Sequence, residues 1–253
     1  MKFYTFFRRN LKEIVRDPLS LIFCIGFPAI LLIVFRIIFS SMGEKVYEAT
    51  PQFRIDQLVP NMCLFGFTFL SLFVGMLLAK DRTTSFLARL RSTSLRPADF
   101  MLGYAVPMLP IALFQEIILL FIGLLFGLNL TANVFFMLLA LLPCSVLFIA
   151  CGVLIGLVLS DKSVGGVASI LVNVAVFLSG MFFPVSAMSG GFVTFMKVLP
   201  YIHISQIAKT VLTGSGVIEF SVWGSVGILA IYTLALTALS VVVFAKKLRK
   251  DNF

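Results

Sequence analysis

The sequence predicts an all-α integral membrane protein with six transmembrane helices, and three observations support this prediction. Hydrophobic residues make up 60% of the 253 residues and charged residues only 12%, whereas a soluble domain carries about 25% charged residues. Several apolar runs reach the roughly 20 residues that a spanning helix needs. These runs are continuous instead of alternating, which favours helices over a β-barrel.

The basic leader that precedes the first span predicts a helix lying in the membrane interface. Phe3, Phe7, Leu11 and Ile14 recur at helical spacing, while the basic residues fall largely elsewhere. The pair Asp17-Pro18 then predicts a break, because proline suits the first position of a new helix.

The six spans are predicted at residues 19–42, 58–79, 101–128, 133–159, 165–183 and 222–245. Pro107 and Pro110 predict a bend in the third span. Ser71, Gly75 and Ala79 fall four apart and predict a stripe of small residues that allows close helix packing. The third and fourth spans also contain Gly123-xxx-Gly127 and Gly152-xxx-Gly156.

A basic segment, Lys80–Pro97, separates the second and third spans and holds five Lys or Arg residues against Asp81 alone. Its middle has helical spacing and predicts a short amphipathic helix outside the membrane. We interpret this helix as a docking surface for a soluble partner; the alternative is a solvated anchor on acidic lipids. The residues assigned to docking are Arg82, Phe86, Leu87, Arg89, Leu90 and Arg91.

Residues 184–216, between the fifth and sixth spans, are too apolar for an exposed loop and too broken for one span. They predict two short re-entrant helices in the outer leaflet, packed against protein. His203 is the only histidine and cannot form a zinc site alone; it is interpreted as a polar residue at the outer interface, with pH sensing as the alternative. The residues assigned to this region are Gly180, Pro184, Pro200 and His203.

The distribution of positive charge predicts the orientation. Of the 20 Lys and Arg residues, 15 lie in the leader, the basic segment, the 160–164 turn or the tail. Basic loops belong on the cytoplasmic side, so both termini are expected in the cytoplasm. The net charge of +9 does not indicate nucleic acid, because the basic residues lie at span ends and form no single solvated face.

Three stretches resemble the membrane subunits of ABC exporters of the ABC-2 type, also described as type V-like permeases. The leader Arg8–Leu21 is similar to the family's interfacial helix, and Lys80–Gly103 to its coupling loop. Leu178–Met188 followed by Val198–His203 resembles the fifth span and outer re-entrant helices, in an unusual order and spacing. The coupling loop departs from the family pattern in having Asp81 near the usual Glu.

The resemblance implies a single transmembrane domain over residues 1–253, with an interfacial helix (1–18), a coupling loop (80–99) and an outer re-entrant segment (184–216). It also implies a permease that is not itself an enzyme, in the cytoplasmic (inner) membrane of a prokaryote. Two copies of an ABC ATPase would bind ATP and Mg²⁺ and dock on the coupling loop. A second permease copy or a paralogue would complete the path. This chain has no phosphate-binding loop of its own, and no cofactor is expected in it.

Two charges lie inside predicted spans at matching depths, Arg36 and Glu116. They are expected either to form an ion pair or to extend separately to the outer headgroups. Phe65, Phe69 and Phe73, with Asn61 one turn earlier, line up as a candidate translocation path for an apolar cargo. The alternative for these aromatic residues is lipid-facing bulk or packing.

The favoured function is export of an amphipathic or hydrophobic molecule, such as a drug, a peptide antibiotic or a lipid. The alternatives are an intramembrane lipid-modifying enzyme and an ATP-independent transporter. An enzyme needs clustered acids or histidines near a span end, and a secondary transporter shows repeats or mid-span acids. The four cysteines lie in apolar runs without a CxxC pair, so no metal site is indicated.

Overall fold

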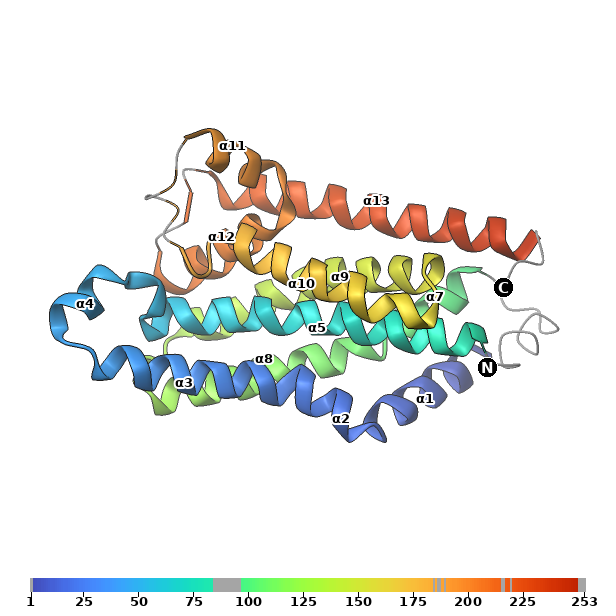
Figure 1. Cartoon of the computed structure of the whole chain (residues 1–253), viewed down its shortest axis with the longest axis horizontal. Helices are drawn as coiled ribbons and strands as arrows, with labels where there is room; N and C mark the ends of the chain where they lie inside the picture. Colours follow the sequence, from blue (N-terminus) through green and yellow to red (C-terminus); the bar gives the residue numbers. More distant parts are fainter. Residues whose placement is uncertain are drawn as a thin grey trace.

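The computed structural model of the chain is an elongated bundle of helices, with both termini at one end (Figure 1). It describes residues 2–83, 97–183, 185, 188, 190–214, 217, 218 and 220–249. This described part contains six helices long and apolar enough to cross a membrane and no strand. The predicted all-α membrane fold with six spans is therefore confirmed. We call the end with the termini the basic end and the opposite end the far end.

The first span begins at a corner after α1 (Lys2–Val15). The carboxylate of Asp17 accepts hydrogen bonds from the backbone N and the Oγ of Ser20, at 3.2 and 2.5 Å. It thereby caps α2 (Pro18–Leu21). A π-helical turn (Ile22–Gly26) and α3 (Phe27–Ser41) continue the span. The predicted break at Asp17-Pro18 is confirmed.

The second and third spans flank the basic segment. The connector before the second span contains α4 (Glu44–Ala49) and a 3-10 turn (Pro51–Phe53), so it is more ordered than its polarity predicts. The second span is α5 (Ile55–Thr83). The third span is divided into α7 (Pro97–Ala105) and α8 (Met108–Leu125), with Pro107 between them. This division confirms the bend predicted from the prolines.

The centre of the bundle is the contact between α5 and α9 (Ala132–Val158). A Cβ atom on Gly152 would lie 2.2 Å from the backbone O of Ser71, and one on Gly156 would lie 2.6 Å from the backbone O of Gly75. Only glycine permits the two backbones to approach so closely. The close packing predicted for the Ser71–Gly75 stripe is confirmed, and its partner is the glycine pair of α9.

The fifth span, α10 (Asp161–Leu178), is shorter than predicted. The prediction extended it to residue 183, but Gly180 has a φ of 70°, in the left-handed region that ends a helix. The chain then forms α11 (Gly190–Val198) and α12 (Pro200–Thr213) before the sixth span, α13 (Val222–Arg249). These are the two short helices predicted within 184–216, and Pro200 starts the second of them. Their depth in the membrane stays a prediction.

Candidate functional site

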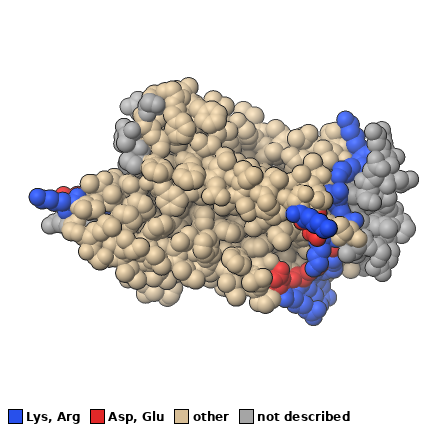
Figure 2. Space-filling view, viewed as in Figure 1, with Lys and Arg blue, Asp and Glu red and all other residues tan. Residues whose placement is uncertain are grey.

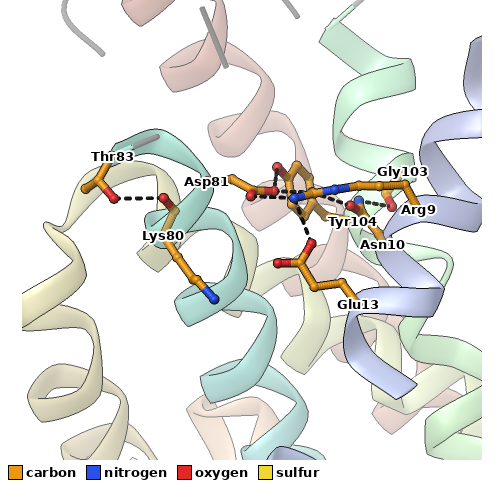
Figure 3. Close-up of polar contacts among 8 residues, drawn as sticks. All are labelled: Arg9, Asn10, Glu13, Lys80, Asp81, Thr83, Gly103 and Tyr104. Atoms are coloured by element: carbon orange, nitrogen blue, oxygen red, sulfur yellow. Dashed lines mark hydrogen bonds and ion pairs between the residues drawn. The ribbon is translucent and has the colours of Figure 1, made fainter. Parts of the chain in front are cut away.

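Lys and Arg side chains gather at the basic end of the molecule, while the body of the bundle shows almost none on the face drawn (Figure 2). At this end, polar side chains from three helices meet in a cluster that we call the polar junction (Figure 3). Its members are Arg9, Asn10 and Glu13 of α1, Asp81 of α5, and Gly103 and Tyr104 of α7.

The centre of the polar junction is a bidentate ion pair between the guanidinium of Arg9 and the carboxylate of Asp81. Arg9 Nη1 lies 2.5 Å from Asp81 Oδ2, and Arg9 Nη2 lies 2.8 Å from Asp81 Oδ1. The hydroxyl of Tyr104 donates to Asp81 Oδ2 at 2.6 Å, and Arg9 Nη2 also lies 2.7 Å from Glu13 Oε2. Such a planar, bidentate pair fixes orientation as well as distance, so α1 cannot rotate freely against α5.

Asn10 extends the polar junction to the backbone of α7. Its Nδ2 donates to the carbonyl O of Gly103 at 2.8 Å, and its Oδ1 accepts from Arg9 Nη1 at 2.8 Å. Asn10 is fully buried, and a buried amide is stable only when it is hydrogen-bonded. The asparagine therefore holds α1 against α7 while its neighbour Arg9 holds it against α5.

The electrostatics of the polar junction depend on unequal burial. The Asp81 side chain is 3% exposed and that of Arg9 33%. Burial acts to lower the pKa of Arg9, but the hydrogen bond and charge of Asp81, with help from Glu13, outweigh it and raise that pKa. Arg9 is thus held in its charged form, and a carboxylate as buried as Asp81 requires such a partner.

An aromatic cluster supports the polar junction from the apolar side. The Phe6 ring stacks on Phe100 and meets Tyr104 edge-on, with centroid distances of 5.9 and 5.1 Å. Phe100 also stacks on Phe244 of α13 at 4.2 Å. A Cβ atom on Gly103 would lie 2.1 Å from the Phe6 ring, so this glycine leaves the space that the ring fills. The cluster links α1 and α7 to the last span.

Basic side chains also hold the C-terminal end of α9. Arg82 Nη1 donates to the carbonyl oxygens of Gly156, Leu157 and Leu159 at 2.8, 2.6 and 3.0 Å. Lys247 Nζ donates to Leu157 O at 2.6 Å. The last carbonyls of a helix lack intrahelical partners and carry its negative dipole end, so cations there are favourable. Arg82, which was assigned to docking, therefore makes contacts inside the subunit.

Of the other residues assigned to docking, Phe86, Leu87, Arg89, Leu90 and Arg91 lie outside the described residues. Their role stays a prediction. What the structure describes are the two anchors of their segment, the end of α5 and the start of α7. The polar junction holds both anchors.

The predicted ion pair between Arg36 and Glu116 is not formed. Glu116 is fully buried in α8, and among the described residues neither of its carboxylate oxygens has a hydrogen-bond partner. The ion pair was one of two alternatives left open by the sequence, because matching depth along two helices does not determine which faces they turn toward each other.

The candidate path residues of α5 pack within the subunit. The Phe27 ring of α3 contacts the rings of Phe65 and Phe69 at 5.8 and 5.7 Å, and Phe69 stacks on Phe73 at 6.4 Å. Asn61 donates to Met181 O at 3.4 Å. These contacts favour a packing role for Phe65, Phe69 and Phe73. A translocation path along them stays a prediction.

The far end is held by neutral polar groups around His203, which is fully buried. Its Nε2 donates to Lys197 O at 2.8 Å, and its Nδ1 lies 3.0 Å from Ser225 Oγ. Burial lowers the pKa of His203 against the opposing effect of the Lys197 carbonyl. The histidine therefore ties α12 to α11 and α13, and its location at the outer membrane interface stays a prediction. Pro184 lies outside the described residues.

The sequence analysis missed most of the polar junction. It noted Asp81 as the single acid of the basic segment, near the usual Glu of the family, and Arg9 only as part of the leader. It assigned no contact to Asp81 and no role to Asn10 or Tyr104. The sequence did contain a signal for this contact. Asp81 is the single acid of the basic segment and lies at the end of an apolar span, where a buried carboxylate needs a cationic partner. Within the described residues, no group of three or more His, Cys, Asp or Glu side chains could hold a metal ion.

A comparison with models of known protein families identifies the family of this chain. The profile of the family described as ABC-2 type transporter matches residues 1–213. No curated protein matches the chain in a sequence search. The matched range runs from the first residue to the end of α12 and includes every member of the polar junction.

Proposed function

Because this chain belongs to the ABC-2 type transporter family, we propose that it is the membrane subunit of an ATP-driven exporter. Membership makes it a permease component that works with an ATPase subunit. The proposal adds the direction of transport, two ATPase copies, and a second permease copy or paralogue. ATP and Mg²⁺ are then bound by the ATPase.

The observation that carries this proposal is the polar junction. It joins α1 to both helices that flank the basic segment, α5 through Asp81 and α7 through Tyr104 and Gly103. A soluble partner that presses on the segment between these helices would move all three as one body. An arrangement of this kind suits a subunit that receives force instead of one that performs chemistry.

The fold offers a route for that motion across the membrane. α5 has 29 residues, which at 1.5 Å per residue extend about 44 Å. The glycine contacts lock its middle to α9, and cores packed at this density shift between discrete arrangements instead of deforming continuously. A displacement of α5 at the basic end is therefore expected to move its far end as well. There, Ser205 of α12 donates a hydrogen bond to Asn61 of α5.

The orientation follows from the charge distribution. The leader, the basic segment, the 160–164 turn and the tail together hold 15 of the 20 Lys and Arg residues, and the described members of this set gather at the basic end (Figure 2). The positive-inside rule then places this end and both termini in the cytoplasm. The cytoplasmic membrane of a prokaryote is the proposed location.

An amphipathic or hydrophobic cargo suits the lining of the bundle. A pocket of about 180 Å³ lies among α5, α9, α10, α12 and α13. Its wall is mostly apolar, with hydroxyl groups from Thr68, Ser71, Tyr201 and Tyr232. Few polar groups on an apolar wall favour a drug, a peptide antibiotic or a lipid-like molecule over a strongly charged solute.

The test is reconstitution with the ATPase encoded nearest to this permease. We expect the two chains to co-purify and to move a fluorescent amphiphile only with ATP. Leu87→Glu should lower transport at least tenfold while ATP hydrolysis continues. Leu130→Glu is the matched control, because Leu130 is exposed in the turn before α9. Transport without ATP, or equal loss in both variants, would contradict the proposal.

A further inference from the structure

A second site at the basic end is a pocket of about 850 Å³ beside the polar junction. Its walls come from α1, the corner at Asp17, the last turns of α5, the start of α8 and the start of α10. Lys80 marks the end of the apolar run of the second span. The pocket therefore lies where the apolar part of the bundle meets its charged end.

Cations line one side of this pocket in a regular order. Arg8, Lys12 and Arg16 lie four residues apart along and just after α1, so they share one face of the helix. Lys80 of α5 faces the same space. All four side chains are exposed, whereas the fifth lining cation, Arg9, is already bound by Asp81 and Glu13.

The carboxylates in the lining leave an excess of positive charge. Glu13 is paired with Arg9. Asp17 accepts hydrogen bonds from Ser20, which lower its pKa and hold it ionised, and Lys80 acts on it electrostatically. Asp161 at the start of α10 is the third acid. Four cations remain against two available carboxylates, and the pocket therefore favours an anion.

The floor of the pocket is apolar. Phe73, Met76 and Leu77 lie on one face of α5, a turn below Lys80, and Met108 of α8 lies beside them. Met76 is 42% exposed, so its thioether surface is open to a ligand. This site has cations on one side and apolar surface on the other, and it lies at the membrane boundary. It is therefore complementary to an anionic phospholipid, whose charged headgroup and apolar acyl chain meet at the same depth.

We propose that this pocket binds an anionic phospholipid, with its phosphate among Arg8, Lys12, Arg16 and Lys80 and an acyl chain against Phe73 and Met76. The lipid is a resident ligand that supports α1, and the proposal holds whether or not this protein is an exporter. Since Arg9 and Glu13 line the pocket from the polar junction, an occupied pocket stabilises the contact of α1 with α5.

The test measures lipid binding to the full-length protein in nanodiscs. Phosphatidylglycerol is titrated into a phosphatidylcholine background, and bound lipid is counted by native mass spectrometry. The double variant Arg8→Gln with Lys12→Gln should weaken phosphatidylglycerol binding about 10- to 30-fold. The reason is that each basic residue near an anionic lipid surface raises the affinity for that lipid by about three- to fivefold. The matched control, Lys162→Gln with Lys246→Gln, removes two exposed charges at the same end and should leave binding unchanged.

A second arm separates a lipid from free phosphate. Met76→Ser keeps every cation and removes apolar floor, so it should weaken lipid binding several-fold and leave inorganic phosphate binding in detergent unchanged. If phosphate binds as tightly as phosphatidylglycerol and Met76→Ser has no effect, the ligand is a soluble phosphate and the lipid proposal fails. Equal lipid binding by the pocket variant and its control would also overturn it.

Discussion

The two ends of the bundle are held together by different kinds of contact. At the basic end, charged side chains bind one another between α1 and α5, as Arg9 binds Asp81, and the neutral Tyr104 of α7 donates to the same carboxylate. At the far end, neutral side chains bind backbone groups: Gln206 Oε1 accepts from the amides of Val217 and Ile218, and its Nε2 donates to Phe220 O.

The difference follows from what each end must join. The far end contains irregular backbone between α12 and α13, and its buried amides and carbonyls need partners. At the basic end the central contact joins two regular helices through side chains, Arg9 to Asp81. The backbone groups that need partners there are carbonyls at and near helix ends, and Asn10, Arg82 and Lys247 donate to them. A charged, oriented contact suits the end that, in the proposed function, receives force from the ATPase, and neutral contacts to the backbone suit an end that closes the fold.

Breaking the centre of the polar junction should have the largest effect. Asp81→Ala leaves Arg9 and Tyr104 without their common partner, and we expect a loss of about 3 kcal/mol in stability, because one partner of a buried pair is removed. ATP-coupled transport should fall at least tenfold, measured in proteoliposomes. Tyr104→Phe removes one hydrogen bond and should cost about 1 kcal/mol. Equal effects of both variants would show that Asp81 is not the centre.

Forcing α5 away from α9 should lower the stability of the whole bundle, because this contact lies between the two ends. Gly152→Ala places a Cβ atom 2.2 Å from the backbone O of Ser71, and such overpacking costs about 1–3 kcal/mol. Gly165→Ala in α10 meets nothing within 4 Å and should be neutral or stabilise the helix by about 0.5–1 kcal/mol. Thermal unfolding of the two variants checks the contrast, and equal shifts would contradict it.

Removing the central side chain of the far end should destabilise the protein without uncoupling it. Gln206→Ala leaves two amides and one carbonyl without their partner, which should cost about 1–2 kcal/mol. Transport per ATP hydrolysed should remain at the level of the unchanged protein. A loss of coupling as large as that of Asp81→Ala would remove the distinction between the two ends.

Acid should loosen the far end more than the basic end, with the smallest effect of the series. Burial lowers the pKa of His203 below its ordinary 6.5, so the folded state binds fewer protons there than the unfolded state. Stability from this group is present above pH 6.5 and falls as the pH drops from that value toward the folded pKa. Hydrogen exchange of α12 and α13 should therefore quicken toward about pH 5.5. His203→Gln should remove this dependence.

Residue types and spacing were enough to predict the six spans, the break at Asp17-Pro18, the bend at Pro107 and the two short helices before α13. These features depend on apolar run length and on local proline and glycine geometry, which neighbouring residues set. The stripe of small residues on α5, Ser71, Gly75 and Ala79, was also predicted, although its pairing with the glycines of α9 was not. The spacing and charge of the basic segment, together with the family resemblance, led to the docking residues, most of which lie outside the described part.

Only the tertiary structure decided which polar groups meet. Asp81 binds Arg9, 72 positions earlier in the chain, and Glu116 does not bind Arg36 despite their similar depth. The physical reason is that depth follows from counting residues along one helix, whereas a contact also depends on how two helices are rotated and displaced relative to each other. Packing of Phe6 against Gly103, and of Gly152 against Ser71, sets that rotation, and no local pattern in the sequence contains it.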